Sequence, residues 1–132
     1  MVQGIKTVAR IGYAVAAWVL VAMVFIQVFY AGVAVLVSPG DWSAHRSFGS
    51  MVSLPVMLMA LLSLAGRMPV RFFLLTLGLY ALYMTQYLLI YLPGQFDLPV
   101  LSALHPVNAL VILLSAIYAA RESTKLVRRN DS

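Results

Sequence analysis

The chain has no cysteine among its 132 residues, and only 10% of its residues are charged. Without cysteine it cannot form disulfides, thiolate metal sites or covalent c-type haem attachments, and it has no thiol nucleophile. Soluble domains typically carry about 25% charged residues. The shortage of charge, together with a hydrophobic content of 63%, indicates a protein whose solvent is a lipid bilayer.

Four long apolar runs separated by short turns take up almost the whole chain. A bilayer-spanning helix needs about 20 mostly apolar residues, and turn residues such as Pro and Gly separate the runs. We expect helices at about residues 11–37, 43–66, 70–92 and 99–120, followed by a polar cytoplasmic tail at 121–132. Short connections make successive helices antiparallel. The sequence therefore predicts an all-α fold, an integral membrane antiparallel (up-down-up-down) four-helix bundle.

The helix ends and one interior position carry further signals. Pro55 lies inside the second run and predicts a kink there. Asp41 or Ser43 is expected to cap the start of the second helix, and Asp97 the start of the fourth, with Pro99 in its first turn.

The basic residues are distributed unevenly between the two ends of the expected bundle. Eight of the nine fall on one side, namely Lys6, Arg10, Arg67, Arg71, Arg121, Lys125, Arg128 and Arg129. Arg46 alone falls on the other. By the positive-inside rule we expect a multi-pass protein of the cell (inner) membrane with cytoplasmic N- and C-termini. This topology accounts for the net charge of +5, so no nucleic-acid partner is expected.

The two histidines of the chain fall on the second and fourth helices, near the outer membrane face. Because helical bundles house cofactors between facing helices, His45 and His105 could ligate one haem iron axially. Gly49 and Ala109, each four residues later, leave room on the same face for a flat porphyrin. The placement also suggests an internal two-fold repeat. One difficulty is depth, because His105 lies further from its expected helix start, by about 6 Å.

Polar neighbours of the histidines have both a functional and a structural interpretation. Arg46 lies where haem propionates need a cationic partner, but it also suits an interfacial anchor or a partner of Asp41. Asn108 could donate a hydrogen bond to a propionate or a bound ligand. Gln86 could contact a haem or a quinone, or link helices by a hydrogen bond. The histidines themselves could be amphipathic interface anchors.

Three short motifs, spread over about residues 40–115, resemble those of a known family. They are His45-Arg46-Ser47-Phe48-Gly49, Thr85-Gln86-Tyr87-Leu88 and Leu104-His105-Pro106-Val107-Asn108-Ala109-Leu110. Together they resemble one four-helix half of a haem A synthase, a duplicated bundle in which each half offers two histidines to a haem. The chain is also similar to small uncharacterised bacterial four-helix membrane proteins with this order of motifs. The resemblance implies that His45 and His105 are axial ligands.

The chain departs from haem A synthase in the residues that matter for catalysis. That family has a functional glutamate shortly before the first His-Arg, where this chain has Asp41-Trp42-Ser43-Ala44, and Glu122 is its one glutamate. The outer-loop cysteine pair and the second half are also missing. Hydroxylation of a haem methyl group is therefore not expected, and no other enzymatic activity is predicted.

The sequence favours a small membrane b-type haem protein with bis-His ligation near the outer face. Two imidazoles fill both axial positions, so electron transfer or redox or ligand sensing is more natural than oxygen activation. A quinone in the bilayer or an external redox protein would be the electron partner. The alternative is a cofactor-free structural or accessory subunit, in a homo-oligomer or a larger membrane complex. Hydrolase and kinase motifs are missing.

Overall fold

The computed structural model describes residues 2–129, and within that range it contains helices and turns but no strand. Its elements are α1 (Val2–Leu36), α2 (Ser43–Met51), α3 (Ser53–Ala65), α4 (Val70–Gln95), the 3₁₀ helix η1 (Pro99–Ala103) and α5 (Leu104–Arg128). Four spans in this part of the chain are long and apolar enough to cross a membrane, the second formed by α2 with α3 and the fourth by η1 with α5. The expected all-α, membrane-spanning four-helix bundle is confirmed.

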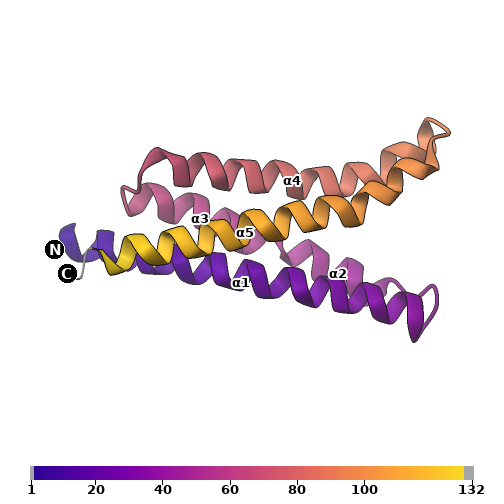
Figure 1. Cartoon of the computed structure of the whole chain (residues 1–132), viewed down its shortest axis with the longest axis horizontal. Helices are drawn as coiled ribbons and strands as arrows, with labels where there is room; N and C mark the ends of the chain where they lie inside the picture. The colour runs from indigo at the N-terminus through magenta and orange to yellow at the C-terminus, as the bar shows by residue number, and fades with distance from the viewer. Residues whose placement is uncertain (1, 130–132) are drawn as a thin grey trace.

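The spans form an elongated antiparallel bundle in which α1 begins and α5 ends at the same end (Figure 1). α1 packs against α3 and α5, and α4 packs against the same two helices, so the second and fourth spans lie diagonally across the bundle. At the opposite end α2 packs against α1, and η1 packs against α4 and α5. The two hairpins diverge toward that end (Figure 1).

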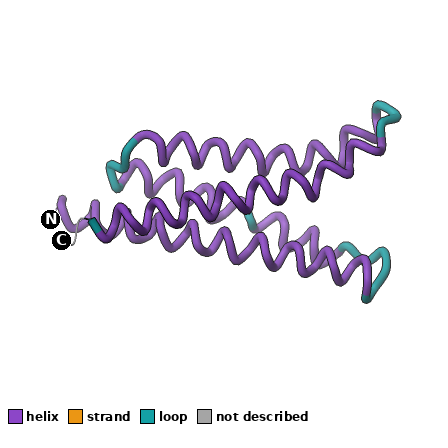
Figure 2. The backbone as a smooth tube through the Cα atoms, in the orientation of Figure 1, coloured by secondary structure: helices purple, strands orange, loops and turns teal. Residues whose placement is uncertain are grey.

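The kink expected from Pro55 takes the form of a break between α2 and α3 at Val52, drawn as a loop segment in Figure 2. Proline has no N–H to bond the carbonyl four residues earlier, which loosens the preceding turn. From α4 the Tyr83 hydroxyl reaches the helix turn before the break, lying 3.3 Å from the Gly49 carbonyl oxygen and 3.4 Å from that of Ser50. The second span is thus two helices rather than the single helix expected over residues 43–66.

Other boundaries also differ from expectation. α1 begins at Val2 rather than near residue 11, and α4 continues through Pro93 to Gln95. The fourth span opens with η1, and its first flanking residue is Leu98, so Asp97 does not cap it. Asp97 has a positive φ of 54° instead. At the other end α5 continues to Arg128 through most of the expected polar tail, whose residues 130–132 lie outside the described part.

The best-packed part of the core lies toward the end where α1 begins. Tyr13, Leu20, Met59 and Phe72 are almost fully buried there. The Tyr13 hydroxyl is 2.9 Å from the Thr76 hydroxyl, and its ring meets Phe72 edge-on at 5.6 Å. At the other end, by contrast, no residue of α2 is fully buried. The divergent end is therefore the less densely packed half of the bundle.

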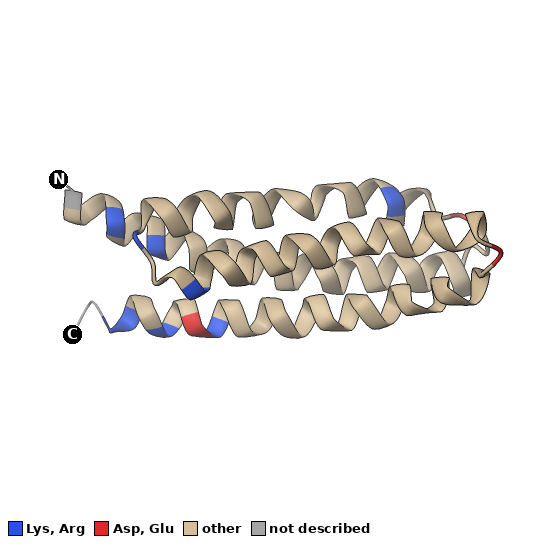
Figure 3. Ribbon diagram, turned by 90° about the horizontal axis from the view of Figure 1, so that it is seen from above, with Lys and Arg blue, Asp and Glu red and all other residues tan. Residues whose placement is uncertain are grey.

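Charges separate along the bundle axis. Figure 3 shows Lys and Arg gathered toward the end where α1 begins and α5 ends, whereas the loops at the other end carry acidic residues. Those loops contain Asp41, between α1 and α2, and Asp97, between α4 and η1. Arg46 in α2 is the basic residue at their end.

Candidate functional site

The two histidines meet at the divergent end of the bundle, across its diagonal. The ring centres of His45 and His105 lie 6.2 Å apart, with an angle of 60° between the ring planes. The expected difference in depth is absent because His105 is the second residue of α5 and His45 the third residue of α2. The 3₁₀ helix η1 takes up the residues that would otherwise have placed His105 deeper.

Each histidine is held by a backbone carbonyl of the preceding span. His45 Nδ1 lies 3.1 Å from the Gln27 carbonyl oxygen, and His105 Nδ1 lies 3.1 Å from the Gln86 carbonyl oxygen. A carbonyl oxygen can only accept, so both Nδ1 atoms carry the proton and the neutral rings present the Nε2 lone pair. The Nδ1 contact with the carbonyl oxygen fixes the tautomer and the orientation of the ring, as is typical of metal-ligating histidines.

The Gln–His pairing repeats in the two hairpins. In the first hairpin the glutamine lies on α1 and the histidine on α2, 18 residues apart. In the second the glutamine lies on α4 and the histidine on α5, 19 residues apart. The repeat suggested by the histidines thus extends to their carbonyl partners. Gln27 was not among the expected site residues, although it is the one strongly polar side chain in its apolar run.

The side chains of these two glutamines differ in their hydrogen bonding. Asn108 Nδ2 donates to Gln86 Oε1 and to the Leu82 carbonyl oxygen, both at 2.8 Å. Three residues after His45 the equivalent position is Phe48, which has no polar group. Gln27 Oε1 is buried and, among the described residues, has no hydrogen-bond partner. Gln86 thus forms the interhelical hydrogen bond that was one of its two expected roles.

Gly49 was expected to make room for a porphyrin, but its neighbour in the structure is the side chain of Gln27. A Cβ at this position would collide with the amide nitrogen of Gln27. The glycine therefore allows the Gln27 side chain to lie against α2, where α2 packs on α1. Ala109 is half-buried one turn after His105 on α5, which keeps the helix face beside that histidine small.

Arg46 and Asp41 do not pair directly. Arg46 is exposed, and no ion pair joins it to Asp41 within the described residues. Asp41 Oδ1 instead accepts hydrogen bonds from the Ser43 hydroxyl at 2.6 Å and the Ser43 backbone N–H at 3.0 Å. These bonds hold the pKa of the Asp41 carboxyl below its ordinary value. Asp41 thus attaches to the first residue of α2, but the N-cap residue is Trp42, so neither Asp41 nor Ser43 caps the helix as expected.

Aromatic side chains contact α2 at and beyond His45. Trp42 meets His45 edge-on, with ring centres 5.6 Å apart. Deeper in the bundle the buried Tyr83 has its hydroxyl 2.9 Å from that of Tyr87. Tyr80 and Tyr91, on the same helix, are exposed.

The donor set narrows the kind of metal site that these residues could form. Within residues 2–129 no group of three or more His, Cys, Asp or Glu side chains converges on one point. A structural zinc site needs four protein ligands and a catalytic zinc site three. Two imidazoles match a metal whose remaining ligands come from a cofactor, as the four nitrogens of a porphyrin do.

Comparison with protein families matches residues 27–92 to a family of unknown function (DUF6220). No curated protein and no solved structure matches the chain significantly. The matched segment includes Gln27, His45, Gly49 and Gln86, and ends before His105. It covers 66 of the 132 residues, half of the chain, and the protein therefore belongs to the DUF6220 family.

Proposed function

We propose that this protein binds one non-covalent b-type haem, with His45 and His105 as its two axial ligands, and that it serves in electron transfer or redox or ligand sensing. The observation that carries the proposal is the 6.2 Å separation of the two imidazole centres across the bundle diagonal. It brings together the residues that the resemblance to half of a haem A synthase implies as ligands.

The separation fits a metal held between two imidazoles. A metal–nitrogen bond of about 2 Å, added to a ring radius of about 1.2 Å on each side, gives a spacing of about 6.4 Å between trans imidazole centres. An interfacial anchor has no need for such a partner, because each ring would then turn toward the headgroups independently. The spacing therefore supports shared ligation over separate anchoring.

The hydrogen bonds of the histidines support the same role. The carbonyl oxygens of Gln27 and Gln86 hold the Nδ1 protons, so each Nε2 keeps its lone pair for a metal. The carbonyl contacts also make the imidazoles more basic and fix their orientation. The hairpins diverge at this end (Figure 1), and no residue of α2 is fully buried. Separating the helices here to admit a haem would therefore disrupt less packing than at the other end.

A bound haem would supply a one-electron Fe(III)/Fe(II) couple at one end of the bundle. Histidines occur only at that end, so a second ligand pair is missing at the other and one haem would not carry electrons across the membrane. A quinone in the bilayer or a redox protein at the membrane surface would exchange electrons with it. By the positive-inside rule the histidine end faces outward, with the termini in the cytoplasm.

Haem content tests this proposal. Protein purified in mild detergent from haem-supplemented cells should yield about one haem b per chain on extraction with alkaline pyridine. No cysteine is present to attach the group, so acid acetone should remove it completely. Haem-free protein from such cells would contradict the proposal and favour a cofactor-free structural subunit.

A further inference from the structure

The side chain of Gln27 occupies space beside His45 that a flat ligand would need. Gly49 lies one helical turn after His45 on α2, and residues four apart share a helix face. A Cβ at Gly49 would collide with the Gln27 amide nitrogen, so the amide lies against α2 on that face. The backbone carbonyl oxygen of the same glutamine lies 3.1 Å from His45 Nδ1. Gln27 thus holds the imidazole with its backbone and fills the neighbouring space with its side chain.

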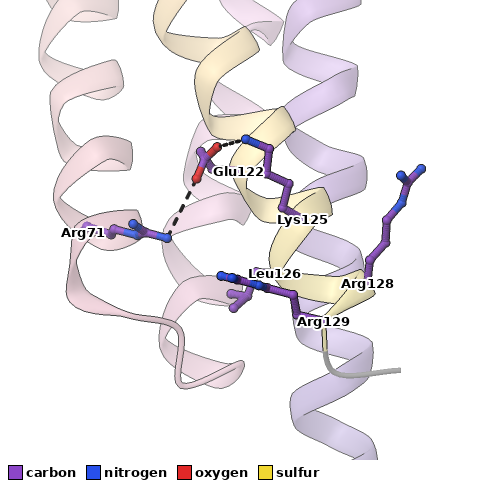
Figure 4. Close-up of a pocket in the computed structure, with 6 residues that line it drawn as sticks. All are labelled: Arg71, Glu122, Lys125, Leu126, Arg128 and Arg129. Carbon is purple, nitrogen blue, oxygen red and sulfur yellow. Dashed lines mark hydrogen bonds and ion pairs between the residues drawn. The ribbon is translucent and has the colours of Figure 1, made fainter. Parts of the chain in front are cut away.

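Two open pockets lie elsewhere on the molecule. One of about 510 Å³ lies at the opposite end, between α4 and α5, where Glu122 forms two ion pairs (Figure 4). The other, of about 260 Å³, is lined by apolar side chains between Leu88 and Leu104. Neither pocket is lined by His45 or Gly49. A ligand of His45 therefore fits neither pocket, and room for it requires a side chain to move.

The Gln27 side chain is poorly held in its place. Its Oε1 atom is buried and has no hydrogen-bond partner within residues 2–129. A buried acceptor without a partner is unfavourable, so a rotation that brings Oε1 to a polar partner or to water removes a penalty. In the second hairpin Asn108 donates to Gln86 Oε1 at 2.8 Å and restrains that side chain. Gln27 is therefore the less restrained of the two glutamines.

We propose that the Gln27 side chain is a displaceable plug, which fills the space over Gly49 in the haem-free protein and must leave it before haem binds between His45 and His105. This inference rests on the haem-binding function proposed above. A site that is open in only a fraction of the molecules has an apparent Kd equal to its intrinsic Kd divided by that fraction. The length of the side chain at position 27, rather than its polarity, should therefore set the affinity for haem.

The test measures haem uptake by full-length, haem-free protein in detergent, followed by Soret absorbance after haemin is added. Gln27→Ala and Gln27→Ser shorten the side chain, one to an apolar and one to a polar group, whereas Gln27→Met keeps its length. A plug in place in about four-fifths of the molecules weakens the apparent Kd about fivefold. Both short variants should therefore bind haem about fivefold more tightly than the parent and take it up faster, and Gln27→Met should bind no more tightly.

Val28→Ala is the matched control, because it truncates the neighbouring side chain, which is 56% exposed and faces away from α2 packing. It should bind haem with the affinity of the parent. Circular dichroism of each haem-free variant should show unchanged helix content. Two short variants are used so that the test stands if one of them folds poorly.

Three results would overturn the plug while leaving the proposed function intact, because haem binds in each of them. The first is equal affinity of the parent and both short variants. The second is weaker binding by the short variants, because the amide would then help to hold the haem. The third is tighter binding by Gln27→Met and Gln27→Ala alike, because polarity rather than length would then be the obstacle. Absence of haem binding in the parent and in every variant would instead refute the proposed function, and the plug with it.

Discussion

The amide nitrogen of Asn108 lies 2.8 Å from Gln86 Oε1, so a side chain of α5 satisfies the glutamine that precedes it on α4. The matching glutamine of the first hairpin, Gln27, has a buried Oε1 without a partner among the described residues. In both hairpins the backbone carbonyl of a glutamine contacts a histidine. Only in the second hairpin does the side-chain oxygen of that glutamine also have a hydrogen-bond partner among the described residues.

This asymmetry predicts opposite effects for the same substitution. Gln86→Met should lower the free energy of unfolding by about 1 kcal/mol, because it removes a hydrogen bond between helices. Gln27→Met should be neutral or stabilising, because it removes a buried side-chain oxygen that has no hydrogen-bond partner within residues 2–129. Thermal unfolding followed by circular dichroism in detergent would measure both. Equal losses in the two variants would show that the two amides are equally well satisfied.

Gly49→Ala tests the contact between α1 and α2. The new methyl group would collide with the Gln27 amide nitrogen, and overpacking of this kind costs about 1–3 kcal/mol. Shortening the neighbour in Gly49→Ala/Gln27→Ala should restore most of the loss. Gly78→Ala on α4 is the control, because a Cβ there meets nothing within 4 Å. A Gly49→Ala variant as stable as Gly78→Ala would contradict the close approach.

Tyr83 is predicted to stabilise the break in the second span. Tyr83→Phe should lower the free energy of unfolding by about 1 kcal/mol, because its hydroxyl contacts the Gly49 and Ser50 carbonyl oxygens and the Tyr87 hydroxyl. Tyr80→Phe removes an exposed hydroxyl from the same helix and should change stability by less than about 0.5 kcal/mol. The two variants would behave alike if the break needed no support from α4.

Orientation in the membrane can be read from single cysteines, since the parent chain has none. Gln95→Cys, at the end of α4, should react with a membrane-impermeant maleimide in intact cells. Arg67→Cys, in the turn before α4, should react only after the cells are permeabilised. The reverse pattern would place the termini outside and refute the orientation expected from the basic residues.

The sequence was sufficient to predict the number of spans because that number depends on length and apolar content, which are local properties. Pro55 likewise indicated a kink, although the break falls at Val52 because the lost hydrogen bond affects the turn before the proline. The extension of α5 to Arg128 was missed. A polar tail was expected there, yet the Glu122–Lys125 and Glu122–Arg71 pairs favour a helix.

The candidate site was only partly predictable, because part of it depends on tertiary packing rather than on local sequence. His45, His105 and the small residues beside them could be read from helical spacing. The 3₁₀ geometry of η1, which removes the depth difference, and the carbonyl contacts of Gln27 and Gln86 depend on how two hairpins pack. Such contacts leave no local pattern in one sequence. The space over Gly49 was assigned to a porphyrin because the approach of α1 was not foreseeable.

Chemical rescue separates loss of a ligand from loss of the fold in histidine variants. In His45→Gly and His105→Gly, free imidazole at millimolar concentration should enter the space left by the ring and restore the parental haem spectrum. Circular dichroism should report unchanged helix content in both variants, because each histidine contributes one backbone hydrogen bond at the divergent end. A spectrum unresponsive to imidazole in folded, haem-loaded variants would argue against ligation at these positions.

Shared ligation by His45 and His105 is tested most directly by the electron paramagnetic resonance spectrum of the oxidised haem-loaded protein. The parent should give the low-spin signal of two axial imidazoles. His45→Ala and His105→Ala should each replace it with a high-spin signal or lose the haem, because the iron would keep only one strong-field imidazole, with at most a weak-field water in the other axial position. A parental low-spin signal retained in both single variants would contradict the account.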